Sequence, residues 1–99
     1  MKTEDALAAL GQCRERIDDV DRRIVALLNE RTNVVEEIGR IKGEAQLPVY
    51  EPKREDQVFL NITSNNAGPL SNEAAKRIFE RIIDEMRKIQ RDKMGNKSC

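Results

Sequence analysis

The sequence contains no histidine and no tryptophan, and it has only two cysteines, Cys13 and Cys99. Without histidine, a catalytic triad, an imidazole general base and a histidine-ligated metal are excluded. The two cysteines lie far apart and form no CxxC pair, so neither a zinc site nor a disulfide framework is expected, and the pair is typical of a reducing compartment. We therefore expect no metal and no cofactor.

Long apolar runs are also missing. The longest, Ile24–Leu28, is much shorter than the roughly 20 residues that cross a bilayer, and the first residues lack the apolar stretch of a signal peptide. We therefore expect a cytoplasmic protein with no membrane partner. Lys and Arg together number 18, as do Asp and Glu, and aromatic residues make up only 3%. This balance argues against a nucleic-acid partner.

What the sequence does contain is helical pattern. With 99 residues, we expect a single all-α domain that spans residues 1–99, because no stretch shows the alternation of a strand. Helix breakers and capping residues divide it into three helices. The expected helices run from about Thr3 to Glu44, from Pro52 to about Thr63, and from a Ser71 N-cap to about Arg91, with residues 92–99 expected to fray.

The first helix carries apolar residues at alternating spacings of three and four, which is the a/d pattern of a coiled coil. At 1.5 Å per residue this helix is about 57 Å long, whereas a compact domain of this size has a radius of gyration near 13 Å, estimated roughly. A second chain is needed to cover such a stripe, so we predict an intertwined homodimer with antiparallel long helices. The stripe, called the seam below, consists of Leu10, Cys13, Ile17, Val20, Ile24, Leu27, Val34, Ile38 and Ile41.

Charged residues interrupt the apolar faces, and they are the candidates for function. Arg31 occupies a seam position, where a charge is costly unless it is paired; the structural alternative is a device that sets the dimer register. Lys42 returns to nearly the same face about 16 Å further along, although a lysine there could simply complement the helix dipole. Arg14, about 25 Å from Arg31, could share a ligand with it only across an antiparallel dimer.

Three further polar residues continue apolar faces of the later helices. Arg54 and Glu55 precede Val58 by one turn, and Gln90 follows Met86 by four residues. The structural alternative for Arg54 and Glu55 is a first helical turn stabilised by salt bridges. For Gln90 it is the edge of the apolar face, where that face ends. Together with the cations of the first helix, these residues suit a small dianion that carries a hydroxyl and an ether or carbonyl oxygen. No nucleophile accompanies them, so catalysis would work by orientation and electrostatics.

At these residues the sequence resembles the all-helical chorismate mutases, the small intertwined dimers of aromatic amino-acid biosynthesis. The resemblance runs from about Leu10 to Arg91, and the stretch from Leu47 to Val58 is also similar to mutase domains fused to the first shikimate-pathway enzyme. It therefore implies another enzyme of that pathway as a candidate partner. The motifs that carry it are Arg14–Asp21, Leu27–Arg31, Ile38–Lys42, Pro48–Glu55, Gly68–Ser71, and Ile78–Ile83 continuing to Gln90.

The resemblance implies the Claisen rearrangement of chorismate to prephenate, without a covalent intermediate or cofactor, at sites shared between the two subunits. Two positions depart from the family pattern: Glu51 stands where an Asp often contacts the ring hydroxyl, and Met86 stands where some members have a Ser near a carboxylate. The resemblance implies that Arg14 of the partner subunit binds one substrate carboxylate and that Arg31 of the same chain binds a carboxylate. It also implies that Lys42 and Gln90 donate to the ether oxygen and that Glu55 binds the ring hydroxyl. Arg54 would lie at the mouth of the site.

Three alternatives remain open at the level of sequence. An isochorismate–pyruvate lyase uses the same scaffold and a similar dianion, although the match from Lys42 to Glu55 favours the mutase. A non-catalytic antiparallel coiled coil for dimerisation explains the seam and Arg31, but leaves Glu55 and Gln90 unexplained. A regulatory domain whose weak mutase activity is raised by a partner enzyme fits every motif.

Overall fold

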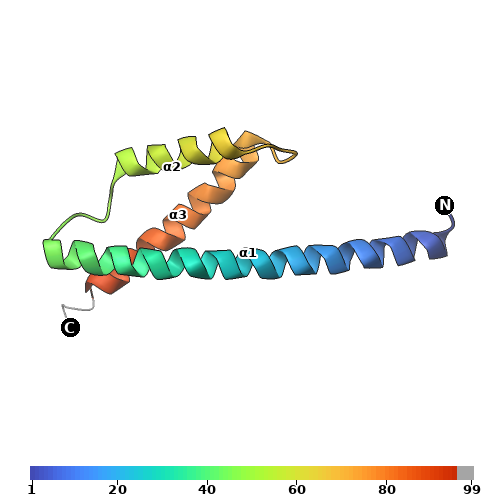
Figure 1. The fold of residues 1–99 in the computed structure, drawn as a ribbon, viewed down its shortest axis with the longest axis horizontal. Coiled ribbons are helices and arrows are strands. Elements are labelled where there is room, and N and C mark those ends of the chain that lie inside the picture. The colour runs from blue at the N-terminus through green and yellow to red at the C-terminus, as the bar shows by residue number, and fades with distance from the viewer. Residues whose placement is uncertain (96–99) are drawn as a thin grey trace. The chain divides into compact units, whose positions relative to one another are not determined.

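The computed structural model describes residues 1–95 of the chain (Figure 1). These residues form three helices and no strand: α1 (Thr3–Ala45), α2 (Pro52–Asn65) and α3 (Asn72–Gly95). The expected all-α class and the order of the helices are confirmed. No helix in this part of the chain is long and apolar enough to cross a membrane. The expected frayed tail lies partly outside the described residues, as does Cys99.

The chain divides into two units, and the division falls within α1. The first unit, Met1–Asn33, consists of the N-terminal part of α1, and the second begins at Val34 and contains α2 and α3. In the first unit the apolar seam residues are exposed, with Ile17 at 57% and Leu27 at 63%. In the second unit Val34, Ile38 and Ile41 are exposed as well. The seam is therefore an open apolar stripe in the single chain.

The core of the second unit uses a different face of α1. Its buried residues there are Val35, Gly39 and Lys42, spaced four and three residues apart, which is the spacing of one helix face. The α3 residues Ala75, Ile83 and Met86 complete the buried set. Of the α3 residues expected to face inward, Ile78 is exposed instead. It lies one position before Phe79, about 100° around the helix from that half-buried side chain.

The connector between α1 and α2, residues 46–51, is turned back by a helix-capping motif. Gln46 adopts a left-handed conformation with φ 59°, and the Leu47 N–H donates to the Lys42 carbonyl at 2.8 Å. This is the Schellman arrangement, which satisfies a carbonyl at the helix end. The helix thus ends at Ala45, three residues before Pro48, which was the expected breaker. The turn directs the connector back toward the Lys42 side chain.

The starts of α2 and α3 follow the expected capping rules. Pro52 occupies the first turn of α2, where a missing N–H costs nothing. Glu51, at the N-cap position, makes no capping hydrogen bond with its side chain, so its carboxylate remains available elsewhere. The Ser71 hydroxyl accepts a hydrogen bond from the Ala74 N–H at 3.1 Å, which confirms Ser71 as the N-cap of α3.

At its far end, α3 extends beyond the expected boundary. It continues to Gly95, so residues 92–95 are helical and the prediction of an end near Arg91 is wrong. The last turns are stabilised by tertiary contacts: Lys93 forms an ion pair with Glu36 of α1 at 3.3 Å. Local sequence did not reveal this pairing, because the two residues are far apart in the chain.

Gly39 lies at a close approach between α1 and α3. A Cβ atom there would lie 3.1 Å from the Lys93 Cβ and 3.2 Å from the Gln90 carbonyl oxygen. We expect Gly39→Ala to lower the free energy of unfolding by roughly 1 kcal/mol, because overpacking by about 1–3 kcal/mol outweighs a helix-propensity gain of about 1 kcal/mol. Urea denaturation at one fixed protein concentration measures the difference.

The matched control for this substitution is Gly11→Ala, at an α1 position with nothing within 4 Å of the added Cβ. It gains helix propensity without a steric cost, so its stability should rise by up to about 1 kcal/mol. Equal stabilisation by both substitutions would contradict the close approach of the two helices at Gly39.

Candidate active site

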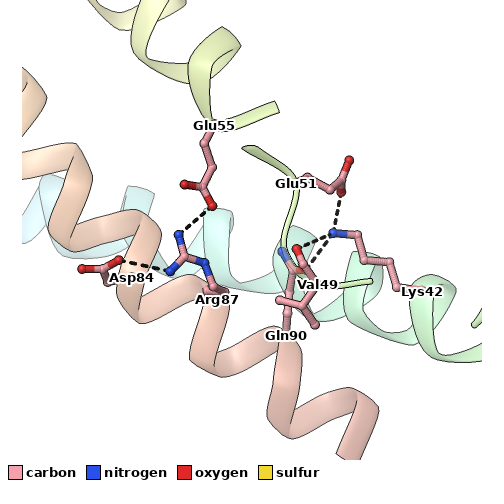
Figure 2. Close-up of polar contacts among 7 residues, drawn as sticks. All are labelled: Lys42, Val49, Glu51, Glu55, Asp84, Arg87 and Gln90. Atoms are coloured by element: carbon pink, nitrogen blue, oxygen red, sulfur yellow. Dashed lines mark hydrogen bonds and ion pairs between the residues drawn. The ribbon is translucent and has the colours of Figure 1, made fainter. Parts of the chain in front are cut away.

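The Lys42 ammonium is the centre of the first polar cluster (Figure 2). Its side chain is only 9% exposed, and Nζ lies 2.5 Å from Glu51 Oε1, 3.1 Å from Gln90 Oε1 and 3.2 Å from the Val49 carbonyl oxygen. An ammonium group has three N–H donors, so each one has an acceptor. The buried charge is thus paired and fully hydrogen-bonded, which offsets the cost of its burial.

These acceptors come from parts of the chain that are distant in sequence. Gln90 belongs to α3, whereas Val49 and Glu51 belong to the connector. Because the Gln90 Oε1 atom accepts from Lys42, its amide Nε2 faces another direction and makes no hydrogen bond within residues 1–95. The pair therefore presents an ammonium group beside an unused amide donor.

A second cluster lies one helical turn away, around Arg87 (Figure 2). Arg87 Nη2 forms an ion pair with Glu55 Oε2 at 2.6 Å, and Nη1 lies 3.5 Å from Asp84 Oδ1. The Arg87 and Glu55 side chains are 24% and 25% exposed. The Arg87 guanidinium also stands over the Tyr50 ring, 5.8 Å from its centroid. The hydrogen bond that Arg87 donates to Glu55 raises the pKa of Arg87 above its ordinary value, so the group stays charged.

The two clusters form two adjacent rows of polar side chains. One row consists of Lys42, Glu51 and Gln90, and the other of Glu55 and Arg87. Glu51 and Glu55 are four residues apart at the start of α2, and Arg87 and Gln90 are three apart on α3. The first carboxylate pairs with Lys42 of α1 and the second with Arg87 of α3. Two cations thus face two carboxylates, so these four groups carry no net charge, and Asp84 beside Arg87 adds one negative charge. A dianionic ligand would need additional positive charge.

The structure brings together four of the residues singled out by sequence, namely Lys42, Glu51, Glu55 and Gln90. Arg87 is the functional candidate that sequence reasoning missed. It follows Ile83 by four residues and so continues the apolar face of α3, which is the same signal that pointed to Gln90.

The other sequence-predicted residues have different surroundings. Arg54 is exposed, so the prediction that it continues the apolar face of α2 is wrong. The half-buried face of α2 instead runs through Glu55, Val58, Phe59 and Ile62. Met86 is buried in the core of the second unit. Arg14 and Arg31 belong to the first unit, where Arg14 is exposed and Arg31 is half-buried.

Comparison with known proteins identifies the family. The family model described as chorismate mutase type II matches residues 13–91. This chain belongs to the type II chorismate mutase family. All residues of the two polar rows lie within the matched range.

Relatives and solved structures within the family agree with this assignment. The bifunctional chorismate mutase/prephenate dehydratase of Pseudomonas aeruginosa is 39% identical over 88 residues, which are 84% of this chain and 23% of that protein. The form II chorismate mutase structure from Thermus thermophilus has a TM-score of 0.81 and 35% identity, covering 83% of this chain and 93% of that one. The Helicobacter pylori chorismate mutase in complex with prephenate also has a TM-score of 0.81, at 25% identity, covering 88% of this chain and 94% of that one.

Several curated relatives are much longer than this chain. It spans between 21% and 23% of the length of three bifunctional chorismate mutase/prephenate dehydratases, from Pseudomonas aeruginosa, Aquifex aeolicus and Neisseria gonorrhoeae. The two solved mutase chains, by contrast, are covered almost completely. The match therefore corresponds to a mutase domain.

Proposed function

We propose that this chain is a chorismate mutase, which rearranges chorismate to prephenate in phenylalanine and tyrosine biosynthesis. The observation that carries the proposal is the buried Lys42 ammonium beside the unused amide donor of Gln90. In this Claisen rearrangement one C–O bond breaks while one C–C bond forms, and negative charge grows on the ether oxygen. Two fixed donors aimed at that oxygen stabilise the transition state more than the substrate.

Substrate binding requires an exchange of partners at Lys42, because all three of its donors are occupied in the free chain. Glu51 is the partner that leaves: it is 49% exposed and sits on the connector, whereas Gln90 is half-buried on α3. The donor that Glu51 releases is then shared between the substrate ether oxygen and an adjacent substrate carboxylate, so the buried ammonium stays paired. The released Glu51 is free to accept a hydrogen bond from the ring hydroxyl beside Glu55.

The proposal includes a homodimer with shared sites. The polar rows of the second unit are charge-balanced, so a dianion needs the further cations Arg31, from the same chain, and Arg14, from the partner subunit. The exposed seam along α1 is the surface that a second copy would cover. Arg54 serves the mouth of the site, and Met86 lines its floor near a carboxylate.

Partners and location complete the proposal. A relative that joins mutase and dehydratase in one protein supports a second enzyme of the same pathway as a partner. We place the protein in the cytoplasm, where the free, exposed Cys13 thiol would stay reduced.

The experiment that tests the function is incubation of the purified protein with chorismate, with identification of the product by chromatography and mass. We expect prephenate. Salicylate and pyruvate formed from isochorismate would favour the lyase. Inertness toward both substrates, with the dimer intact, would support a scaffold or a partner-dependent mutase.

The Gln90 amide leads to a pH prediction. An amide donates at any pH, and the raised pKa of Arg87 keeps that charge constant as well. Because the Gln90 amide does not titrate in this range, we expect kcat to change by less than about twofold between neutral and moderately alkaline pH. The matched variant Gln90→Glu must be protonated to donate, so its kcat should fall as the pH rises. A steep loss with a midpoint near 7 in the wild-type protein would refute this role of Gln90.

A further inference from the structure

Arg87 is a half-buried cation for which the proposed chemistry has no role. Its Nη2 lies 2.6 Å from Glu55 Oε2, and its guanidinium covers the Tyr50 ring in the connector. Its third nitrogen, Nε, is buried and has no hydrogen-bond partner among residues 1–95. Arg87 thus joins α3 to the start of α2 and to the connector, directly beside the Lys42 cluster (Figure 2).

Stability alone does not account for this arrangement. A partly buried ion pair contributes little net stability once desolvation is included, and an apolar residue of similar volume often does as well. A buried N–H without an acceptor is a further cost. The contact with Asp84 is a 3.5 Å pair within one helix to a largely exposed carboxylate, which is a weak interaction. The strong contact is the one with Glu55.

That contact fixes the orientation of the Glu55 carboxylate. Arg87 occupies Oε2 alone, and Oε1 accepts no hydrogen bond within the described residues. Glu51, one turn away, carries a second carboxylate, and Lys42, which pairs with Glu51, carries a competing cation. Without Arg87, the Glu55 carboxylate would be repelled by the Glu51 carboxylate and attracted by the Lys42 ammonium. Arg87 therefore prevents Glu55 from turning toward Lys42.

We propose that Arg87 is a positioning residue: it binds one oxygen of Glu55 so that the other accepts a hydrogen bond from the substrate ring hydroxyl. This inference rests on the proposed mutase function. It predicts that Arg87 acts through Glu55, and that its effect depends on the presence of the hydroxyl.

A double-mutant cycle tests the first point. Arg87→Met and Glu55→Gln should each lower kcat/KM for chorismate by about 10- to 100-fold. The kcat/KM of the double variant should lie within about threefold of that of the less active single variant. Arg87→Lys should recover part of the loss, because it restores one charged donor. The matched control is Arg81→Met, at an exposed α3 arginine paired with Glu85 at 2.9 Å. Its kcat/KM should stay within about twofold of wild type.

An analogue of chorismate without the ring hydroxyl tests the second point. For wild type, kcat/KM should be higher with chorismate than with the analogue, and Arg87→Met should largely abolish that preference. A merely structural role would lower both values by the same factor. Additive losses in the cycle, or equal losses on both substrates, would overturn the inference while the mutase function stands. A wild-type protein inert toward chorismate would overturn the function first and this inference with it.

Discussion

Lys42→Met is expected to lower kcat/KM for chorismate by about a thousandfold or more. Removing a single donor to a developing oxyanion costs about 10²–10³ in kcat, and Lys42 is also proposed to bind a substrate carboxylate by a charge-assisted hydrogen bond. Methionine keeps most of the volume of the buried stem, so packing around α1 is preserved while the charge is lost. Initial rates of chorismate disappearance, with prephenate quantified, measure the effect.

The same substitution leaves polar atoms without their donor, so folding must be checked separately. Glu51 is half-exposed and can turn to water, but Gln90 Oε1 loses its partner, at a cost of about 1–3 kcal/mol. Circular dichroism and urea denaturation determine whether the variant is folded at the assay temperature. Lys88→Met is the matched control: Lys88 is an exposed α3 lysine whose partner is Glu85 at 3.5 Å, and its loss should leave activity unchanged. A folded Lys42→Met protein with activity within about tenfold of wild type would exclude Lys42 as the main electrostatic donor.

Mixing two inactive variants is expected to restore activity. Arg14→Ala and Arg31→Ala should each be nearly inactive alone, since every site lacks one carboxylate-binding arginine. In a mixed dimer, one site draws Arg31 from the first variant and Arg14 from the second, and is complete; the other lacks both. With random exchange at equal amounts, half the dimers are mixed and half their sites are intact, so activity should return to about a quarter of wild type.

Subunit exchange must be demonstrated independently for this result to be interpretable. Mixed dimers of tagged and untagged chains can be counted by native mass spectrometry, and each variant exchanged with itself is the control. Confirmed exchange without recovery of activity would show that each site is built from one chain only. Recovery well above a quarter would show that mixed dimers form in more than the random proportion.

The sequence by itself predicted the order and the starts of the helices and pointed to several residues of the candidate site. Periodicity, Pro52 and Ser71 are local signals, and the helix starts that they predicted are present. Charge on an apolar face is also a local signal, because a buried charge is costly wherever the helix packs. It led to Lys42, Glu55 and Gln90, which the fold brings into two adjacent rows.

The end of α3 and the face of α2 were harder to predict. Residues 92–95 are helical, and Lys93 among them pairs with Glu36 of another helix, a contact that no signal within α3 records. Arg54 and Glu55 are adjacent on α2, so a small rotation of that helix decides which of them turns inward. In the structure the Glu55 side chain turns inward, where it pairs with Arg87.

Sequence alone therefore determined the three helices and the apolar seam, because these depend on neighbours within a few residues. Only the tertiary structure decided which acceptors surround each cation. Lys42 and Gln90 are separated by 48 positions, and Glu55 and Arg87 by 32. Their pairing depends on how the helices cross, above all on the approach of α3 to Gly39. That crossing is set by packing between distant segments, which local pattern does not encode.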